Sequence, residues 1–550
     1  MTKAVELLQQ GRDEELWQMC CGFISLTLEQ FMAIQKRLLL EQIEALNRCA
    51  LGTKIMRGVK PQTIEEFREQ VPLTTYADYC PELLEKREEL LPVQPDFWVR
   101  TSGKSGEYSC KWVPIAPAYS HELSIVMYGI GILSGCRDWG DISALNECPK
   151  IVYTVAPRPY ISGALAYILE GQTTVDYLPP MEEAESLEFE ERIKLGFKQA
   201  LTEGFDYFFG LSLVLVAVGN KFSQSSDKMD IRSLLSQPKA LLRLTKGLVK
   251  SKLARRSMLP KDLWPVKGIM SGGLDSGVYR DKIKELWGKY PLDVYAGTEG
   301  GIIATQTWDY DGMTFIPSLN FLEFIPEKEY FKWQLDHNYQ PKTVLLDEVQ
   351  SGENYEIVIT NFHGGAMIRY RPGDMVRITS LRNEKLGIDI PQMIFEGRAD
   401  AIIDFDVIRL TEKVIWQAIG NTGIPFEDWV ARKEVSENMT LHLFIELKDG
   451  FRASDVEIGI AVEEQLKHLD SNFTAFRSDF GGSIDFALEV TRLSKGAFAH
   501  YISQRQAEGA ELAHLKPPHI NPSDKVLSLL LAKPEVAPEV KAEAEAVAVH

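Results

Sequence analysis

Residues Asn361 to Leu410 read NFHGGAMIRYRPGDMVRITSLRNEKLGIDIPQMIFEGRADAIIDFDVIRL. Two turns rich in glycine and charge stand in this stretch, YRPGD at Tyr370 to Asp374 and GRAD at Gly397 to Asp400, and each lies beside a β-rich run. The Asp374 carboxylate, on a Pro-Gly turn before a strand, is suited to bind two vicinal hydroxyls such as those of a ribose. The second turn leads into a new apolar strand and is a candidate joint between two domains. Both are equally compatible with plain surface turns, and only the rest of the chain can distinguish these interpretations.

The composition is that of an ordinary globular protein with more than one domain. The chain has 550 residues, of which 45% are apolar and 25% charged, and at ~150 residues per domain this length predicts about two to four units. The formal net charge of -18 disfavours a protein that wraps nucleic acid or lies on an anionic membrane, so we expect neither partner. The basic stretch Lys239 to Lys261 is interpreted as a solvated helix face.

All seven cysteines lie between Cys20 and Cys148 without a CxxC pair, which predicts reduced thiols. The first residues, MTKAVELLQQGRDEELW, lack the basic and apolar regions of a signal peptide. The longest apolar run, Tyr207 to Gly219, is shorter than the ~20 residues of a membrane-spanning helix and is predicted to be a buried element. We expect a cytoplasmic, monomeric protein without a membrane span.

Helical and strand-like patterns alternate along the chain, which is typical of an α/β fold. Helical patterns cover Thr27 to Ile55 and Thr202 to Val218, whereas Lys150 to Val155 and Tyr355 to Thr360 are predicted strands. We predict a large N-terminal domain of mixed β-sheets and helices at residues 1–397, a smaller C-terminal α+β domain at residues 398–520, and a disordered tail at residues 521–550. The tail prediction rests mainly on the Ala/Glu/Val/Pro repeat that begins at Lys533.

A loop of small and hydroxyl residues, TSGKSG, extends from Thr101 to Gly106. Gly103 and Gly106 let a ligand approach the backbone closely, and the hydroxyls of Thr101, Ser102 and Ser105 suit phosphate oxygens. The loop is not a Walker A motif, because Trp98 stands where that motif needs a glycine. It is either a phosphate-binding loop or a plain flexible turn.

A second glycine motif, SGGLDS at Ser271 to Ser276, follows a predicted strand and precedes the helical run Val278 to Lys289. This order resembles the pyrophosphate loop of N-type ATP pyrophosphatases. Those enzymes carry the motif on the first strand of their catalytic domain, whereas here it lies in mid-chain. A turn that only joins a strand to a helix is a comparably good interpretation.

A third motif, YAGTE at Tyr295 to Glu299, combines an aromatic ring, a turn, a hydroxyl and a carboxylate. The Tyr295 ring can stack on a nucleobase, and the Thr298 hydroxyl can meet an α-phosphate. The Glu299 carboxylate can hold Mg²⁺, which prefers oxygen ligands. A tyrosine and a glutamate beside a turn are also common without any function.

The order of the motifs is more specific than any one of them. A glycine and hydroxyl loop, a GG turn, YxxTE, YRxGD, GRxD and a late lysine resemble the signature order of the acyl-adenylate-forming superfamily. The sequence is most similar to the acid-amido synthetases of the auxin-responsive Gretchen Hagen family. This resemblance covers about residues 30 to 520 and is carried by the segments Phe67–Tyr76, Arg100–Gly106, Lys111–Pro114, Tyr370–Asp374 and short segments between Gly496 and Pro518.

The resemblance implies one nucleotide site built from all these motifs. It implies that Tyr295 packs near the adenine, that Thr298 contacts the α-phosphate, and that Glu299 binds Mg²⁺. It implies that Asp374 binds the ribose, that Arg398 contacts the nucleotide across the joint, and that Lys516 is the C-terminal lysine that supports adenylation. The residues that would hold the ATP phosphates are Thr101, Ser102, Gly103, Lys104, Ser105, Gly106, Gly272 and Gly273.

The chain departs from the plant pattern at three places. Lys104 stands where threonine is usual, Gly297-Thr298 where two serines are usual, and Gly397 to Asp400 is closer to the hinge of the wider superfamily. The nucleotide motifs are intact despite these departures. The departures argue against a plant hormone as the substrate.

The implied activity is that of an ATP-dependent ligase with Mg²⁺ as cofactor. It would convert a carboxylic acid to an acyl adenylate with release of pyrophosphate, and then transfer the acyl group to an amine, for which we expect an amino acid. The acid pocket is expected in the first domain, near Tyr119 to Leu133 and Tyr160 to Tyr167. Three alternatives stay open: an acyl-CoA ligase, an N-type ATP pyrophosphatase, and a non-catalytic nucleotide or acyl-group sensor.

Overall fold

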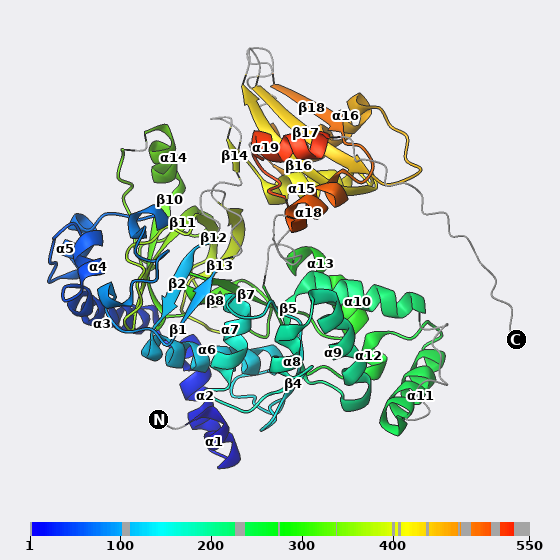
Figure 1. Cartoon of the computed structure of the whole chain (residues 1–550), viewed down its shortest axis with the longest axis horizontal. Coiled ribbons are helices and arrows are strands. Elements are labelled where there is room, and N and C mark those ends of the chain that lie inside the picture. Colours follow the sequence, from blue (N-terminus) through cyan, green and yellow to red (C-terminus); the bar gives the residue numbers. More distant parts are fainter. Residues whose placement is uncertain are drawn as a thin grey trace, which may run out of the picture. The chain divides into compact units, whose positions relative to one another are not determined.

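The protein divides into two units, Met1–Glu396 and Gly397–His550, each described here by itself (Figure 1). The structure, a computed structural model, describes residues 3–101, 110–225, 237–272, 276–336, 338–398, 402–404, 409–435, 439–470, 473–474, 486–507 and 517–532. The division falls beside the predicted joint at Gly397, whose φ of +148° is one that residues with a side chain rarely adopt.

The large unit is built on one sheet of 11 strands, in the order β10-β11-β12-β13-β9-β8-β7-β6-β5-β3-β4. Strands β4, β3, β5, β6 and β7 pair in parallel, whereas β7 pairs with β8 in antiparallel fashion. The parallel strands are β3 (Lys150–Tyr153), β4 (Asp176–Leu178), β5 (Tyr207–Leu211), β6 (Gly268–Gly272) and β7 (Leu292–Gly297). The others are β8 (Gly301–Thr305), β9 (Met313–Phe315), β10 (Asn320–Pro326), β11 (Asn354–Asn361), β12 (Asp374–Ser380) and β13 (Gln392–Arg398).

Helices cover both faces of the parallel strands, because residues alternate between the faces along each strand. On β5, Tyr207 packs into the core that contains α6 and α7, and the next residue, Phe208, packs into the core that contains α10 and α13. On β3, Ile151 and Tyr153 face the first core and Val152 the second. The predicted α/β fold class is confirmed.

The helices of the large unit are α1 (Ala4–Gln9), α2 (Asp13–Cys21), α3 (Leu28–Leu46), α4 (Ala50–Ile55), α5 (Ile64–Gln70), α6 (Pro117–Gly135), α7 (Ile161–Leu169), α8 (Met181–Ser186), α9 (Phe189–Glu203), α10 (Ser212–Ser225), α11 (Pro238–Leu253), α12 (Pro260–Leu263), α13 (Ser276–Trp287) and α14 (Glu327–Leu335). A separate hairpin joins β1 (Phe97–Arg100) to β2 (Trp112–Ile115). No described helix is long and apolar enough to cross a membrane. The cysteines, all of them described, are unpaired thiols, as predicted.

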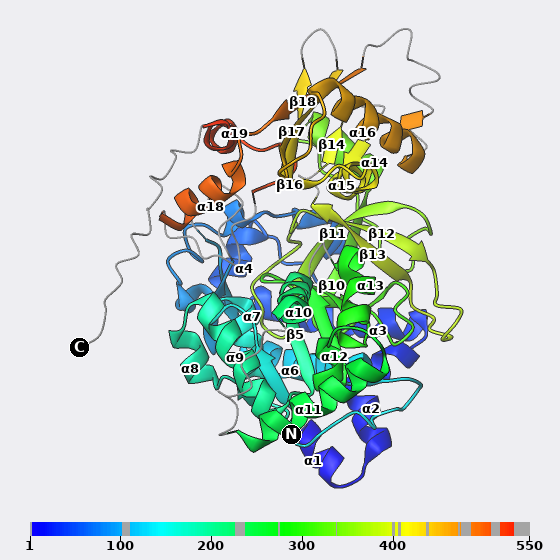
Figure 2. The same ribbon diagram turned by 90° about the vertical axis from the view of Figure 1, so that its right-hand side faces the viewer.

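The small unit is a sheet with helices on both faces. Strand β17 pairs antiparallel with β16 and parallel with β18, and the successive residues Trp429 and Val430 of β16 face two different cores. Helices α18 and α19 pack together on one face (Figures 1 and 2). The elements are β14 (Ile402–Asp404), β15 (Arg409–Thr411), α15 (Glu412–Asn421), β16 (Phe426–Val435), β17 (Met439–Leu447), α16 (Asp455–Leu469), β18 (Phe486–Arg492), α18 (Ala497–Ala507) and α19 (Asp524–Leu531).

Two predictions about secondary structure were wrong. Thr202 to Val218 was expected to be one helix but contains the central strand β5, since a short apolar run has no periodicity that separates a buried strand from a buried helix. The predicted disordered tail at residues 521–550 includes α19, whose Leu527 and Leu530 are buried in the small unit. The repeat from Lys533 onward lies outside the described residues.

Candidate active site

The second and third glycine motifs meet at one edge of the sheet. Strands β6 and β7 are parallel, so their carboxyl ends lie side by side, with Gly272 at the end of β6 and Gly297 at the end of β7. Thr298 and Glu299 follow directly in the turn between β7 and β8, where the sheet changes from parallel to antiparallel. Ligands of α/β proteins bind at this end of parallel strands, where the strand order changes direction.

The turn that carries Glu299 is held by three buried side chains. Asn361 Nδ2 donates a hydrogen bond to the Glu299 carbonyl oxygen at 2.9 Å. Asn320 Nδ2 and the Tyr119 hydroxyl both donate to the Gly300 carbonyl oxygen at 2.7 Å. These bonds come from β10, β11 and α6, so the position of the Glu299 backbone is fixed from three sides.

The Glu299 carboxylate ends a short chain of polar contacts. The Tyr370 hydroxyl donates to Glu299 Oε1 at 2.9 Å, and Lys111 Nζ donates to the same hydroxyl at 3.2 Å. Lys111 Nζ also lies 3.6 Å from Glu299 Oε1. The side chains of Lys111 and Glu299 are 17% and 13% exposed, so this carboxylate is partly accessible to a ligand and already opposed by one cation.

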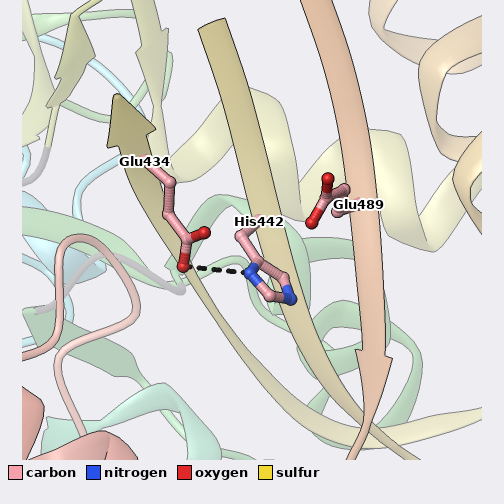
Figure 3. Close-up of side chains that lie close together, drawn as sticks. All are labelled: Glu434, His442 and Glu489. Carbon is pink, nitrogen blue, oxygen red and sulfur yellow. Dashed lines mark hydrogen bonds and ion pairs between the residues drawn. The ribbon is translucent and has the colours of Figure 1, made fainter. Parts of the chain in front are cut away.

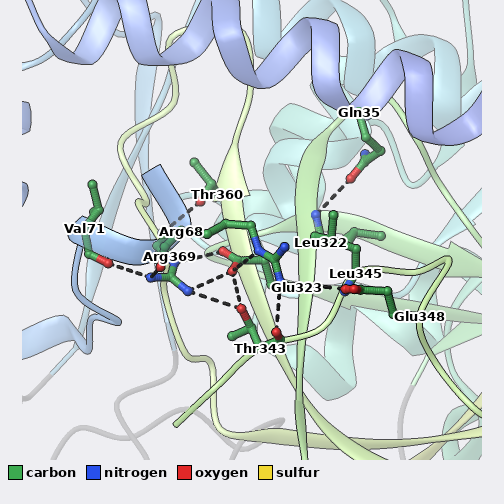
Figure 4. A network of polar contacts seen from close by, with 10 residues as sticks. All are labelled: Gln35, Arg68, Val71, Leu322, Glu323, Thr343, Leu345, Glu348, Thr360 and Arg369. Carbon is green, nitrogen blue, oxygen red and sulfur yellow. Dashed lines mark hydrogen bonds and ion pairs between the residues drawn. The ribbon is translucent and has the colours of Figure 1, made fainter. Parts of the chain in front are cut away.

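Two buried arginines hold Tyr370 in place from either side. Arg369 makes a bidentate ion pair with Glu323 of β10, at 3.0 and 2.8 Å, as Figure 4 shows. Arg371 makes a second one with Glu356 of β11, at 2.9 and 2.7 Å. Between them, the Tyr370 backbone exchanges two hydrogen bonds with Ile359 of β11. An isolated β-bridge therefore joins Tyr370 to the sheet, and its side chain reaches Glu299.

The proposed ribose ligand lies beside the proposed adenine contact. Asp374 begins β12 directly after Gly373, whose φ is +79°. The Tyr295 hydroxyl donates to Asp374 Oδ2 at 2.8 Å, and the Tyr295 ring stacks on Phe395 of β13 with ring centroids 5.3 Å apart. Tyr295 and Asp374 are 79 residues apart in the chain, so the fold brings these two predicted site residues together.

The hairpin of β1 and β2 places Thr101, where the first loop begins, and Lys111 next to this group. The Thr101 amide donates to the Lys111 carbonyl oxygen at 2.9 Å, and the Lys111 amide donates to Thr101 Oγ1 at 3.0 Å. Thr101 and Lys111 thus close the stem of the loop, and the Lys111 side chain reaches Tyr370 and Glu299. The predicted residues that lie outside the described part of the chain are Ser102, Gly103, Lys104, Ser105, Gly106, Gly273 and Lys516; the Arg398 side chain is also outside it.

The described donor groups fit a magnesium nucleotide. Glu299 and Asp374 offer carboxylate oxygens, and Thr298 offers a hydroxyl in a half-exposed turn, which is the ligand chemistry that Mg²⁺ and a ribose require. Burial raises the pKa of Tyr76, whose ring lies 5.7 Å from Lys111 Nζ, so its phenol stays neutral beside this cation. The roles of the individual residues stay predictions.

Sequence reasoning gave no role to Lys111, Tyr370, Asn320 or Asn361. Lys111 directly follows the first loop and Tyr370 opens the YRPGD motif, so both stood in quoted segments. The two asparagines gave no signal, because their function depends on a turn that precedes them by 20 and 62 residues.

A second group of polar side chains lies on the sheet of the small unit. Glu434, His442 and Glu489 bring ligand-type atoms within 4.8 Å of one another (Figure 3). His442 Nδ1 already lies 3.0 Å from Glu434, and Nε2 lies 2.8 Å from the Thr491 hydroxyl. Both ring nitrogens have protein partners, so the group is explained as a polar network that ties β16, β17 and β18 together.

Comparison with known proteins agrees with the resemblance seen in the sequence. The model of the GH3 family central domain matches residues 313–398. A jasmonoyl–L-amino acid synthetase, GH3.5, of Oryza sativa subsp. japonica is 28% identical over 49% of this chain and 48% of its own. A jasmonoyl–L-amino acid synthetase, JAR4, of Nicotiana attenuata is 30% identical over 51% of this chain and 49% of its own. The chain spans about half the length of these curated relatives in the matches.

Solved structures share the fold over nearly the whole chain. The AtGH3.15 acyl acid amido synthetase in complex with 2,4-DB has a TM-score of 0.63 at 17% identity, and the match covers 91% of this chain and 93% of that one. A 2-hydroxyisobutyryl-CoA ligase in the postadenylation state has a TM-score of 0.56 at 14% identity and 91% coverage of both chains. The resemblance to the Gretchen Hagen amido synthetases is confirmed: residues 313–398 match the GH3 family central domain, and the fold is shared with an acyl acid amido synthetase and a 2-hydroxyisobutyryl-CoA ligase.

Proposed function

We propose that this protein is an ATP-dependent acyl acid amido synthetase. The observation that carries the proposal is the grouping of Lys111, Tyr370 and Glu299 next to the pair Tyr295 and Asp374 at the edge of the sheet. These five residues come from three separate segments of the chain, and such a group of ionisable and hydroxyl side chains suits a ligand site better than a plain structural core. The names of the relatives, which are amino acid synthetases and ligases, support the same activity.

In the first step, a carboxylate oxygen of the acid attacks the α-phosphorus of ATP, the bond to the β-phosphate breaks, and pyrophosphate leaves. Thr298 contacts the α-phosphate and Asp374 holds the ribose hydroxyls, so the reacting atoms are positioned before charge develops. Glu299 would hold Mg²⁺, which would supply positive charge against the phosphates. Lys516, which lies outside the described residues, is proposed to stabilise the same step from the small unit.

In the second step, the nitrogen of an amine, most simply of an amino acid, attacks the acyl carbonyl. The bond to the phosphate oxygen breaks, AMP leaves, and the ammonium proton passes to solvent. Arg398 would contact the nucleotide at the joint between the units, and rotation about Gly397 would exchange Lys516 for the acceptor.

An acyl-CoA ligase is the second candidate, because the fold is also shared with a 2-hydroxyisobutyryl-CoA ligase. In that reaction a thiol replaces the amine in the second step. The fold gives no comparable support to an ATP pyrophosphatase, since the SGGLDS strand β6 stands in mid-sheet after three other strands of the same sheet.

The test is a screen for pyrophosphate release over carboxylic acids, followed by mass spectrometry of products with an amino acid panel and CoA side by side. We expect pyrophosphate only when a suitable acid is present, and an amide as the product. A thioester in place of the amide would favour the CoA ligase. Saturable ATP binding without pyrophosphate release with any acid would favour a nucleotide sensor instead.

A further inference from the structure

A cavity of about 50 Å³ lies inside the large unit, between the sheet and the helices α6 and α7. Its wall includes Ile151, Tyr153, Tyr207 and Met270, which all belong to the core on this face of the strands. Met127, Tyr128 and Ala166 close it from the two helices. The wall is almost wholly apolar apart from its tyrosine hydroxyls, two threonines and one asparagine.

Four tyrosines line this cavity, and they fall into two pairs. The Tyr177 hydroxyl donates to the Ala166 carbonyl oxygen at 3.1 Å, and the Tyr207 hydroxyl donates to the Ala144 carbonyl oxygen at 2.9 Å. The hydroxyls of Tyr128 and Tyr153, by contrast, are buried and find no hydrogen-bond partner in the described part of the chain. These two residues are only 5% and 1% exposed.

Two such tyrosines in the wall of one cavity need an explanation, because buried polar groups almost always have a hydrogen-bond partner. Phenylalanine would fill the same space without leaving a donor and an acceptor unsatisfied. Tyrosine at both positions therefore points to something that occupies the cavity and binds to the hydroxyls.

The cavity and the candidate active site are built partly from the same elements. Helix α6 carries Tyr119 in its first turn, where its hydroxyl holds Gly300 in the turn after Glu299, and two turns later the helix presents Met127 and Tyr128 to the cavity. Strand β6 presents Met270 to the cavity and ends at Gly272, in the edge where Thr298 lies. The helices α6 and α7 are those that contain the expected acid pocket.

We propose that this cavity binds the far end of the acid substrate, and that the substrate is an aliphatic acid with a hydroxyl or carbonyl group on its chain. This inference rests on the proposed function. The apolar wall takes the chain, and the hydroxyls of Tyr128 and Tyr153 bind its polar group. A phenol can both donate and accept, so a substrate hydroxyl and a substrate carbonyl both fit.

The size of the cavity narrows the class further. A volume of about 50 Å³ exceeds the ~30 Å³ share of one water molecule but is well below the ~150 Å³ cavity that holds benzene. The enclosed space therefore takes a few atoms of a chain rather than an aromatic ring. An unsubstituted chain would leave both hydroxyls without a partner, which a site with buried polar groups penalises.

The experiment compares straight-chain acids of increasing length with their hydroxy and oxo derivatives. In the wild type, one substituted acid should exceed its unsubstituted parent about 3- to 10-fold in kcat/KM for pyrophosphate release, as expected for one hydrogen bond. Tyr128→Phe and Tyr153→Phe should each reduce this preference, and the double variant should abolish it while turnover of the unsubstituted acid is kept. Neither variant should lower Tm, since neither loses a bond made within the protein.

Tyr177→Phe is the matched control. It removes a hydroxyl that is already bonded to Ala166, so it should lower Tm and leave the ratio between substituted and unsubstituted acids unchanged. If the Tyr128→Phe/Tyr153→Phe double variant changes both acids equally, the hydroxyls serve water or packing only and the inference is overturned.

A second readout separates this inference from the proposed function. Binding of the substituted acid should raise the Tm of the wild type more than that of the double variant, whether or not catalysis occurs. If the substituted acid raises the Tm of the wild type more than that of the double variant but no pyrophosphate is released, the proposed ligase reaction is contradicted and the proposed class of acid is supported. If pyrophosphate is released equally with substituted and unsubstituted acids, the ligase reaction is supported and the proposed class of acid is contradicted.

Discussion

At the scale of single residues, the candidate active site contains two carboxylates whose neighbours fix their positions. Asp374 is held by the Tyr295 hydroxyl, and Glu299 by the Tyr370 hydroxyl and Lys111. None of these pairs is close in sequence. Glu299, which was assigned from a motif, is thus held by Lys111 and Tyr370, to which sequence reasoning gave no role.

Asp374→Ala is expected to raise KM for ATP about 10- to 100-fold, the range for losing hydrogen bonds to a charged group. The wild type should also discriminate against 2′-deoxy-ATP and 3′-deoxy-ATP, and the variant should lose this discrimination. Tyr295→Phe keeps the carboxylate and serves as the control, with discrimination retained. Steady-state kinetics with ATP and the two deoxy nucleotides measure this discrimination. If Asp374→Ala still prefers ATP to the same degree as the wild type, Asp374 does not contact the ribose.

At the scale of elements, the YRPGD segment is fixed by two buried ion pairs with different surroundings. The pair of Arg371 and Glu356 is only 7% and 2% exposed, and that of Arg369 and Glu323 is 6% and 1% exposed. Arg369 also donates to the carbonyl oxygens of Arg68 and Val71, both at 2.6 Å. The second pair therefore satisfies backbone groups as well as a charge.

Removing one arginine should destabilise the large unit by about 3–5 kcal/mol, because a buried carboxylate is left without its partner. The double variant Arg371→Met/Glu356→Met should recover most of this loss. Arg369→Met/Glu323→Met should recover much less, since two buried carbonyl oxygens lose their donor. Urea unfolding of the four variants tests this, and equal recovery in both doubles would contradict the explanation.

The segment after Lys516 is anchored to the sheet of the small unit by a buried histidine. His519 lies between Glu412 and Asp428, at 2.6 and 2.9 Å, and stacks on Trp429 with ring centroids 4.8 Å apart. Burial alone lowers the pKa of this imidazole, but the two carboxylates outweigh it and raise the pKa to about 9. The imidazolium is therefore the form that the folded unit stabilises at neutral pH.

The stability of the small unit should therefore fall at alkaline pH. The pKa of His519 is higher in the folded unit than in the unfolded chain. Its contribution to the free energy of unfolding is therefore complete below pH ~6.5 and is lost as the pH rises through ~9. A shift of this size corresponds to a loss on the order of 3 kcal/mol. Hydrogen exchange of the β16 amides at pH 7 and pH 10, in the wild type and in His519→Gln, measures this loss of stability. If His519→Gln loses as much stability at pH 10 as the wild type, groups other than His519 cause the loss.

Many of the helices and strands could be predicted from the sequence, and the two that were missed have physical explanations. Helix α3 and strand β11 lie close to their expected positions because their residue patterns and caps are local signals, such as Thr27 accepting from the Gln30 amide. Strand β5 was missed since it is buried on both faces and has no alternation. Helix α19 was missed because its stability comes from packing on α18, which its own eight residues do not encode.

For the site, the order of the motifs indicated residues that the fold brings together, but not their contacts. Tyr370 meets Glu299 across 71 residues and Lys111 across 259. Such pairs depend on strand order, which no local pattern states. The orphaned hydroxyls of Tyr128 and Tyr153 were likewise beyond sequence reasoning, because burial without a partner is a property of the packed core.

At the scale of the whole molecule, the joint at Gly397 lies between two units that each have their own core. In the reaction that we propose, the small unit presents different residues in each step, and a glycine at a positive φ is suited to such a joint. This makes Gly397 a position where the two half-reactions can be separated.

Gly397→Ala is expected to keep ATP–pyrophosphate exchange near the parent rate and to slow amide formation about 10-fold, because the altered backbone restricts rotation between the steps. Gly450→Ala is the matched control, since Gly450 also has a positive φ and open space around its Cα but lies in a turn within the small unit. Rapid-quench kinetics of both half-reactions distinguish the two variants. An equal effect on both half-reactions in Gly397→Ala would contradict a role as hinge.

The central claim is that this protein forms an acyl adenylate. The most direct measurement is acid-dependent exchange of labelled pyrophosphate into ATP, without any amine or CoA, with mass spectrometry of the bound intermediate. The account predicts exchange that requires an acid and Mg²⁺, an acyl-AMP of the expected mass, and loss of both in Glu299→Gln. Saturable ATP binding without exchange for any acid, or exchange that Glu299→Gln leaves unchanged, would contradict it.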